Sequence, residues 1–237
     1  MDTKQRYVSK ELTHFVGGNL SKETNDKSQL QEEQYKVLLK IIQEKCIRNP
    51  DWPDDRGTQY RINRKCKLSD NGMIYPGMIC FCDIPLGDLG IHISKYSNFG
   101  LSFSKSFLIK KGANPVLYIA KNSAEGKVTK SEYYDIMADA FINSDLLNSP
   151  NNYGGKLAAT ADLMLHLLSH IKFFDSDKSE DDDENFYMER EWRSLHNIHF
   201  EIKDIRRIIL PNSSFCERFR NDVPEYVGEI TFSSGIA

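Results

Sequence analysis

The chain has 237 residues, of which 40 % are hydrophobic and 27 % are charged, a composition typical of globular proteins. Its formal net charge of −3 hides an uneven distribution, because residues 175–184 contain seven acidic residues whereas residues 56–67 are basic and contain none. Since the sequence has no 18-residue apolar run, no apolar signal-peptide core and no paired CxxC cysteines, it predicts a cytoplasmic protein with reduced thiols and no membrane span.

The first half of the chain is predicted to alternate short strands with helices. Tyr35, Leu38 and Ile42 fall on one stripe opposite charged residues, which is typical of an amphipathic helix. A stretch rich in Asp, Pro, Gly, Asn and Arg predicts a long loop, either functional or disordered. The predicted elements are a strand at 7–16, a mobile polar stretch at 17–27, a helix at 31–45, the loop at 48–77, a strand at 78–82, a short helix or turn at 87–97, a strand at 99–103 and a helix at 104–111 closed by Gly112.

The second half is predicted to begin with a strand and two helices and to end in strands. Its acidic run predicts a solvated, mobile loop because like charges repel; a docking site for a basic partner is the alternative. The predicted elements are a strand at 116–120, helices at 130–147 and 156–173 separated by breakers at 148–155, the acidic loop at 175–184, and strands at 188–194, 197–210 (interrupted) and 226–233. With no internal repeat and no second hydrophobic pattern, residues 1–237 predict a single α+β domain.

The segment 188–193 (MEREWR) is the first candidate site. If it is extended, Glu189, Glu191 and Arg193 share one face, because side chains alternate along a strand. Two adjacent carboxylates raise each other's pKa, so this arrangement costs free energy unless a cation, a substrate or water offsets it. The segment therefore predicts either a functional carboxylate pair or a solvated strand with cross-strand ion pairs.

Two further clusters are candidates for a binding pocket. His14 lies inside a short apolar strand, where it is either a ligand-binding group or a satisfied, half-buried residue. The segment 91–105 combines His, Tyr, two Phe, hydroxyl groups and Gly. Such a mixture suits a pocket in which a flat ring stacks while hydroxyl groups bind polar edges, or else a β-hairpin with aromatic core positions.

A metal site is a weaker alternative. Asp162, His166 and His170 are spaced so that they follow one face of a helix, which would let both imidazoles reach one ion. The same face carries leucines, and no glutamate stands between the histidines, so helix packing explains the spacing equally well. Walker, GxGxxG, GxSxG and HExxH motifs are absent, and the sequence gives no support for ATP hydrolysis, Rossmann-type redox chemistry or serine hydrolysis.

Three segments carry a resemblance to a known family. They are RYVSKELTHF near the N-terminus, FCDIPLGDLGIHISKYSNFGLSFSK in the middle and EREWR towards the end. In this order they resemble the AbiGi-type family of bacterial abortive-infection proteins, over roughly residues 6–122 and 186–212. The resemblance implies phage defence in a toxin–antitoxin setting, and members of the family are labelled antitoxins.

A looser resemblance concerns chemistry, because the order of the three clusters is similar to that of the motifs in ADP-ribosyltransferases such as DarT and the mRNA-modifying toxins of toxin–antitoxin–chaperone systems. It implies a split β-sandwich with peripheral helices that binds NAD as a substrate. Carried over, His14 would hold the NAD ribose, Tyr96 would stack on nicotinamide and Glu191 would contact the ribose hydroxyl groups. Glu189 would be the upstream member of an E-x-E pair. The F-x-x-S-x-x-Y spacing of the family is not clean here, so the residues competing for the stacking role are Tyr96, Phe99 and Phe103.

Two functional hypotheses follow. The first is an antiphage toxin that transfers ADP-ribose from NAD to a macromolecule such as RNA or DNA. Glu191 would stabilise positive charge on the ribose, and Glu189 would orient or deprotonate the acceptor. Arg193 would hold the two carboxylates ionised or contact a phosphate. The basic loop would contact nucleic acid through Arg56, Arg61, Arg64 and Lys65. The alternative is a loop that is simply solvated. The second is a non-enzymatic antitoxin that binds a partner protein. That partner would be a toxin, with a chaperone as a further partner.

Overall fold

The computed structural model describes residues 9–22, 26–49, 60–125, 128–148, 155–179, 182 and 185–236. It contains both helices and sheets, which confirms the predicted mixture of α and β structure. By contacts, the chain divides into two compact units, each described separately below. Unit 1 comprises Met1–Asp55, Met78–Ala113 and Glu189–Ala237, and unit 2 comprises Arg56–Gly77 and Asn114–Met188.

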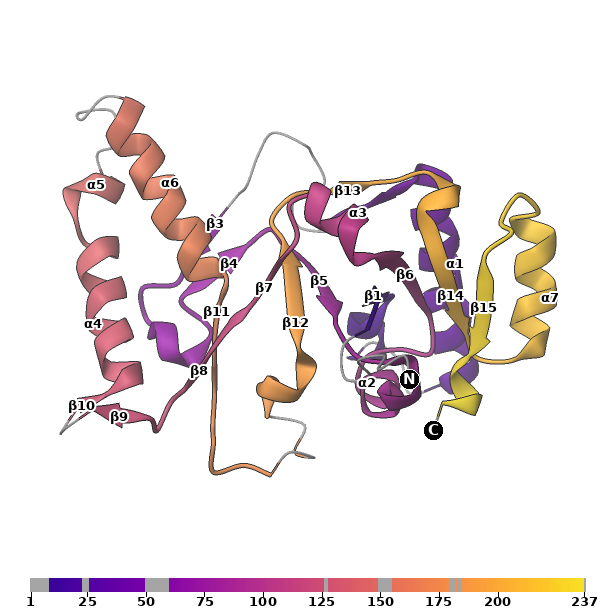
Figure 1. Cartoon of the computed structure of the whole chain (residues 1–237), viewed down its shortest axis with the longest axis horizontal. Coiled ribbons are helices and arrows are strands. Elements are labelled where there is room, and N and C mark those ends of the chain that lie inside the picture. Colours follow the sequence, from indigo (N-terminus) through magenta and orange to yellow (C-terminus); the bar gives the residue numbers. More distant parts are fainter. Residues whose placement is uncertain are drawn as a thin grey trace, which may run out of the picture. The chain divides into compact units, whose positions relative to one another are not determined.

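Unit 1 is built on one sheet (Figure 1). All neighbouring pairs among its strands are antiparallel except the parallel pair of the last two strands in the chain. From one side to the other, the strands are β15 (Glu229–Phe232), β14 (Ile205–Leu210), β6 (Gly100–Ser104), β1 (Glu11–Phe15), β5 (Ile79–Cys82) and β12 (Glu191–Ser194). The sheet therefore brings the N-terminal strand between two segments that lie about 70 to 90 residues further along the chain.

Helices cover both faces of this sheet. On one face, named the α1 face, the largest hydrophobic cluster includes Leu12, Phe81 and Leu101 together with side chains of the helices α1 (Lys27–Glu44), α3 (Lys105–Lys110) and α7 (Ser213–Asp222). On the other, named the α2 face, Cys82 and Ile209 pack in a smaller cluster with Ile93 of α2 (Gly90–Lys95). The alternation of side chains along each strand separates the two clusters.

The helix α1 shows how local sequence sets its own boundaries. Asp26 caps its N-terminus by accepting hydrogen bonds from the backbone N–H groups of Ser28 and Gln29. Lys45 ends it in the left-handed region, with φ of 50°. The predicted stripe is confirmed, since Tyr35 and Leu38 are fully buried. The helix starts four residues earlier than predicted, because the cap lies before the first apolar position.

Short elements complete unit 1. The strand predicted at 197–210 is interrupted, as expected: β13 (Ile198–His199) pairs with β2 (Cys46–Ile47), and a 3-10 turn, η6 (Ile202–Asp204), leads into β14. The helix α7 was not predicted; its amphipathic pattern is short, and only Asn212, which caps it, marks its start. The other 3-10 turns are η1 (Gly18–Lys22), η3 (Leu86–Asp88), η5 (Phe186–Glu189, at the unit boundary) and η7 (Ser233–Gly235).

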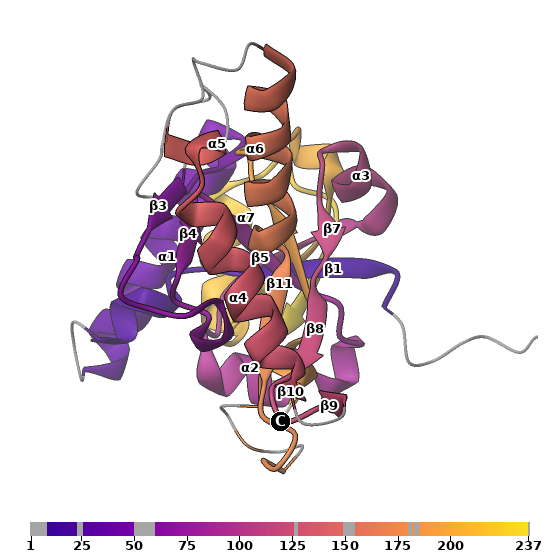
Figure 2. The same ribbon diagram turned by 90° about the vertical axis from the view of Figure 1, so that its left-hand side faces the viewer.

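Unit 2 packs helices against short strand pairs around a hydrophobic cluster of its own. Figure 2 shows β8 beside β11, the parallel pair at its centre. Its strands are β3 (Tyr60–Ile62), β4 (Ile74–Pro76), β7 (Asn114–Pro115), β8 (Leu117–Ala120), β9 (Ala124–Glu125), β10 (Val128–Thr129) and β11 (Ile171–Phe174). Its helices are η2 (Leu68–Asp70), α4 (Lys130–Ile142), α5 (Asp145–Asn148) and α6 (Gly155–Ser169). None of the described helices in either unit is long and apolar enough to cross a membrane.

The predicted loop at 48–77 is wrong over its described second half. Here β3 and β4 form a hairpin, and side chains fasten the turn between them to the rest of unit 2. The Asp135 carboxylate accepts hydrogen bonds from the backbone N–H (2.8 Å) and hydroxyl (2.7 Å) of Ser69. Asn71 donates to the carbonyl of Phe173 and accepts from its N–H. Residues rich in turn signals thus form an ordered segment, because long-range polar contacts satisfy their backbone groups.

Two further boundaries differ from prediction. The helix predicted at 156–173 ends at Ser169, and the following residues form β11 because β8 offers them a strand partner. The strand predicted at 188–194 starts only at Glu191, since the residues before it form the 3-10 turn η5. The predicted mobile loop at 175–184 lies partly outside the described residues; within it, Lys178 pairs with Asp182 at 3.9 Å.

Candidate functional site

Glu189 and Tyr96 meet on the α2 face although they lie 93 residues apart in the sequence. The Tyr96 hydroxyl donates a short hydrogen bond to Oε1 of Glu189. The Lys95 Nζ lies 3.0 Å from the same oxygen. The Glu189 side chain is almost fully buried, so this carboxylate has exchanged water for one hydroxyl and one ammonium group.

Glu191 has its own cation. The Arg193 guanidinium binds it with two hydrogen bonds, Nε to Oε1 at 2.8 Å and Nη2 to Oε2 at 3.2 Å. Both side chains are more than nine-tenths buried. The predicted cost of two neighbouring carboxylates is therefore offset inside the protein, because each carboxylate has a cation of this chain within hydrogen-bonding distance.

The two carboxylates are close, but not for the predicted reason. Glu189 belongs to η5 and not to the strand, so the two-residue spacing does not put it on the face of Glu191 by alternation. Between them, Arg190 has φ of 43°, in the left-handed region that costs a non-glycine residue about 1 kcal/mol or more. This turn lets both carboxylates approach Tyr96, whose pKa is raised by burial first, then by the charge of Glu189 and also by that of Glu191.

His92 lies beside this network and is buried. The ring of Phe15 stacks near both His92 (6.4 Å between centroids) and Tyr96 (6.3 Å). Burial lowers the pKa of His92, and the Glu189 charge opposes that effect only partly. The imidazole is therefore neutral at physiological pH in a mostly aromatic setting.

A second buried ion cluster was missed by sequence reasoning. Asp83, which follows β5 directly, accepts a hydrogen bond from the Lys105 ammonium at 2.6 Å and lies 3.8 Å from the Arg190 guanidinium. Its backbone N–H donates to the carbonyl oxygen of Arg190. Asp83 thereby ties the strained residue before β12 to the end of β5. Its position at the end of an apolar strand, ahead of a proline, was the only signal in the sequence.

The structure places His14 and Glu191 on opposite faces of the sheet. Residues directly opposite each other in antiparallel strands point to the same face. Thr13 lies opposite Cys82, and Cys82 lies opposite Glu191, so these three share the α2 face. His14, the next residue, points to the α1 face, where its ring lies 5.7 Å from that of Phe81. The prediction that His14 and Glu191 line one NAD cleft is corrected by this register.

His14 has a structural partner on its own face. Its Nδ1 lies 2.8 Å from the carbonyl oxygen of Cys80. Burial lowers the pKa of the imidazole, while the backbone hydrogen bond to Cys80 raises it to a smaller extent. A neutral imidazole that donates to a strand carbonyl is the satisfied histidine that was the alternative reading of this position.

Phe99 and Phe103 cannot stack on a ligand in this structure, because neither has any exposed surface. Phe99 packs against Tyr35 and Phe215, and Phe103 packs against neighbouring phenylalanines of the same cluster. Of the three residues predicted to compete for a stacking role, Tyr96 alone is partly exposed and adjacent to the carboxylates. The prediction of a stacking role for Phe99 and Phe103 is corrected to a role in the core.

The predicted nucleic-acid contacts fall in unit 2. Arg56 lies outside the described residues. Arg61 is exposed on β3, and Lys65 is exposed in the turn that follows. Arg64 donates to the carbonyl oxygen of Ile142 and to the side chain of Asn143, and so binds the C-terminal end of α4. One of the predicted contacts thus has a structural role within the unit.

The histidines considered as metal ligands are stacked on each other. The rings of His166 and His170 lie 4.8 Å apart, and Nδ1 of His170 lies 2.9 Å from the carbonyl oxygen of His166. Across the described ranges, no group of three or more His, Cys, Asp or Glu side chains is arranged to hold a metal ion.

The described site is thus a buried network of two carboxylates, their two cations, a tyrosine and a neutral histidine, set on a sheet between helices. Comparison with known proteins gives the class to which the chain is similar, the abortive phage resistance proteins. A family model described as "Putative abortive phage resistance protein AbiGi, antitoxin" matches residues 55–227, and the chain belongs to this AbiGi family, which confirms the predicted family resemblance.

One curated relative gives the same family name. The chain is similar to the "Abortive phage resistance protein AbiGi" of Lactococcus lactis subsp. cremoris, with 26 % identity over 137 residues. The match covers 51 % of this chain and 51 % of the relative, so the chain spans about half the length of the relative it matches. No solved structure matches this chain.

Proposed function

We propose that this protein acts in abortive phage resistance as an antitoxin that binds a partner toxin without catalysing a reaction. The family description names an antitoxin, and the matching relative is named as an abortive phage resistance protein. The observation that carries the proposal is the internal neutralisation of Glu189 and Glu191 by Lys95, Tyr96 and Arg193. Carboxylates held in this way are already bound by groups of the protein, and withdrawing a cation from either one would leave a buried charge uncompensated.

The register of the sheet supports the same function. A catalytic site needs its groups held around one reacting atom, within about 3 Å of it. Because His14 points to the α1 face and Glu191 to the α2 face, the two cannot both reach a single NAD molecule on one face. A binding protein has no such requirement, since its contacts are distributed over a surface.

Expression in bacteria tests this function. The protein is induced alone, and then together with the product of each neighbouring open reading frame. We expect normal growth on induction alone, and rescue from growth arrest caused by one of the neighbours, with the two proteins co-purifying. A Glu191→Gln variant that remains folded should rescue growth as well as the wild type does. Growth arrest on induction of this protein alone would contradict the proposal.

A second candidate function is transfer of ADP-ribose from NAD to a macromolecular acceptor such as RNA or DNA, on the predicted ADP-ribosyltransferase-like fold. One observation favours it: Tyr96, Glu189 and Glu191, which the sequence placed in one site, lie together. Breaking the nicotinamide–ribose bond releases nicotinamide and leaves positive charge on the ribose, which Glu191 would stabilise before the acceptor oxygen or nitrogen attacks. Arg193 would first have to leave Glu191.

Labelled NAD distinguishes the two candidates. The purified protein is incubated with NAD labelled in the adenylate group and with a cell extract, and the products are treated separately with nuclease and protease. The antitoxin function predicts no labelled acceptor. Transfer that is lost in Glu191→Gln but kept in Glu33→Gln, an exposed glutamate of α1, would establish the enzymatic function instead. A chaperone partner would then be sought by co-purification.

A further inference from the structure

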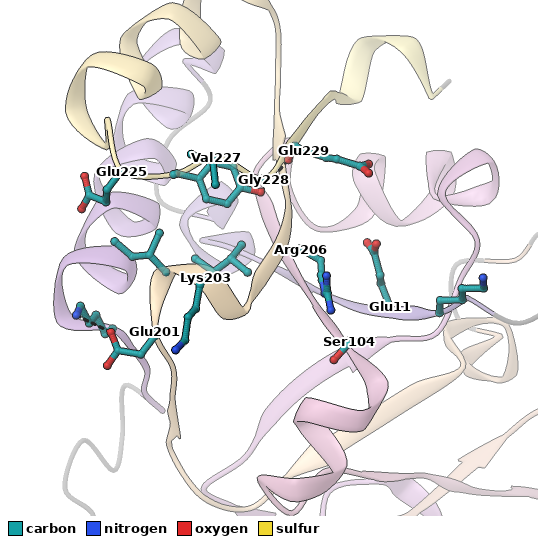
Figure 3. Close-up of a pocket in the computed structure, with 14 residues that line it drawn as sticks. Glu11, Ser104, Glu201, Lys203, Arg206, Glu225, Val227, Gly228 and Glu229 are labelled. Atoms are coloured by element: carbon teal, nitrogen blue, oxygen red, sulfur yellow. Dashed lines mark hydrogen bonds and ion pairs between the residues drawn. The ribbon is translucent and has the colours of Figure 1, made fainter.

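Unit 1 has a groove of about 1050 Å³ that is separate from the buried carboxylate network (Figure 3). It lies where the start of β1 and the end of β6 approach η6, the start of β14 and the segment Glu225–Glu229. Figure 3 shows Lys203 and Arg206 extending into it from η6 and β14. A groove of this size has room for several side chains of a binding partner.

The glutamates along the groove are mostly neutralised by the protein itself. Glu201 pairs with Lys45 at 2.7 Å, and this hydrogen bond raises the pKa of Lys45 and lowers that of Glu201. Glu11 and Glu229 both pair with Arg207, at 3.3 and 2.6 Å. Two cations, Lys45 and Arg207, are thus paired with three carboxylates.

Three cations of the groove differ from these glutamates in their ion pairing. Lys10, Lys203 and Arg206 are exposed and make no ion pair with any residue in the described part of the chain. The groove also contains one further carboxylate, Glu225, which is exposed as well. Counted with Arg207, the five cations of the groove exceed its four glutamates by one charge, and Lys10, Lys203 and Arg206 are the cations that make no ion pair with a described residue and can meet an anionic group of a partner.

The backbone explains why Arg206 projects into the groove. The register of β14 against β6 shifts between Ile205 and Arg207, so that Arg206 is the extra residue of a β-bulge. A bulge turns a side chain out of the regular alternation of the strand. Its neighbour Ile205 is buried while Arg206 is exposed. The bulge thus presents a guanidinium group at the sheet's rim.

Apolar surface in the same groove distinguishes a protein partner from a nucleic acid. Val227 is 92 % exposed, and Tyr226 beneath it is buried and donates its hydroxyl hydrogen bond to the carbonyl of Glu229. Covering Val227 with an apolar side chain would remove apolar surface from water, which favours a partner that carries such a side chain.

We propose that this groove is the docking surface for an acidic segment of a partner protein. Carboxylates of that segment contact Lys10, Lys203 and Arg206, and an apolar side chain of it covers Val227. The inference rests on the proposed partner-binding function and deepens it, because it gives the surface and the chemistry of the partner segment. The buried network around Glu189 has no part in it.

Peptide binding tests the chemistry of the groove directly. Fluorescence anisotropy is measured with a labelled oligoglutamate peptide carrying one central leucine, and with two further probes, an oligolysine peptide and an oligothymidylate of equal charge. We expect the glutamate peptide to bind the wild type, with affinity that decreases as salt increases. In Lys203→Glu/Arg206→Glu the affinity should decrease about tenfold or more, because two contacts become repulsive.

The matched control is Lys36→Glu, a reversal at an exposed lysine of α1 that should change affinity less than about twofold. The milder pair Lys203→Gln/Arg206→Gln replaces the reversed variant if circular dichroism shows that the latter is unfolded. Equal affinity of wild type and groove variant, or tighter binding of the oligothymidylate than of the glutamate peptide, would overturn the proposal.

Growth rescue separates this inference from the proposed function. If the wild type rescues cells from a neighbouring toxin and the groove variant does not, both are supported. If both rescue equally, the groove is not the docking surface although the antitoxin function stands. If the wild type fails to rescue, the antitoxin function fails, and the peptide measurement alone decides whether the groove binds acidic segments.

Discussion

Unit 1 contains two groups of charged residues that differ in how their charges are satisfied. In the buried network, Glu189 and Glu191 each have a cation within hydrogen-bonding distance, and both carboxylates are buried. In the groove, Lys10, Lys203 and Arg206 are exposed and make no ion pair among the residues that are described. Lysine and arginine therefore neutralise buried carboxylates in one part of unit 1 and are exposed to solvent in another.

The difference follows from desolvation. A buried charge without a partner costs several kcal/mol, so a stable fold keeps such charges paired internally and they are unavailable for binding. An exposed charge is solvated and costs little when it is unpaired, so it remains free to bind a partner. The buried network is accordingly expected to control stability, and the groove to control recognition. The following changes test that separation, from the largest effect to the smallest.

Removal of the Arg193 side chain should have the largest effect on stability. Arg193→Met leaves Glu191 buried with its bidentate partner gone, and we expect the free energy of unfolding to decrease by about 3–5 kcal/mol. Urea unfolding followed by circular dichroism measures this change. A decrease below about 1 kcal/mol would mean that Glu191 is solvated and not enclosed.

The double variant Glu191→Gln/Arg193→Met is the control for charge. It removes the isolated carboxylate, so it should be more stable than Arg193→Met alone. Together with the wild type and the single variant Glu191→Gln, it completes a double-mutant cycle that gives the coupling between the two residues. Lys36→Met, on the exposed side of α1, should change the free energy of unfolding by less than about 0.5 kcal/mol. A double variant no more stable than Arg193→Met would show that packing and not charge is lost.

Tyr96→Phe should have the next largest effect. It removes the hydroxyl that donates to Glu189 but leaves Lys95 as a partner for that carboxylate. We expect a loss of about 1.5–3 kcal/mol, the usual range for a hydrogen bond to a charged group. Denaturant unfolding measures it, with Tyr133→Phe as the matched control, because Tyr133 is half exposed on α4. Equal stability of both variants would contradict a structural role for this hydrogen bond.

Sequence alone predicted elements well where a local pattern decides them. The stripe of Tyr35, Leu38 and Ile42 predicted α1, and alternation with breakers predicted β5, β6 and β8 within a few residues. Residues 60–77 and 171–174 were mispredicted because distant partners decide them: Asp135 and Phe173 hold the first segment, and β8 turns the second into a strand. Local propensity cannot detect a partner about 50 to 100 residues away.

The candidate site was predicted in part for the same reason. Glu189, Glu191 and Tyr96 do lie together, and Arg193 binds Glu191, which agrees with one of its two predicted roles. The sequence could not show that Lys95 binds Glu189. It could not place His14 on the opposite face either, because that depends on which residue of β1 lies opposite Cys82. A shift of one residue in strand register reverses the face of every side chain.

The pH dependence of stability tests whether His92 belongs to the buried network. Burial lowers its pKa in the folded state, so the unfolded state binds more protons below about pH 6.5. Stability should therefore be complete above that pH and decrease as the pH falls, by at most about 1.4 kcal/mol per pH unit for one proton. Burial lowers the pKa of His14 as well, so His92→Gln should reduce this dependence in urea unfolding between pH 7 and 5 without abolishing it.

Reversal of the groove charges should have the smallest effect on stability. Lys203→Glu/Arg206→Glu breaks no ion pair with the described residues, and both side chains are exposed, so we expect the free energy of unfolding to change by less than about 0.5 kcal/mol. The same variant should lose binding of the acidic peptide, which Arg193→Met should retain as long as it is folded. A loss of stability comparable to that of Arg193→Met would show that Lys203 and Arg206 are needed by the fold, and the separation between a stabilising buried network and a recognition groove would fail.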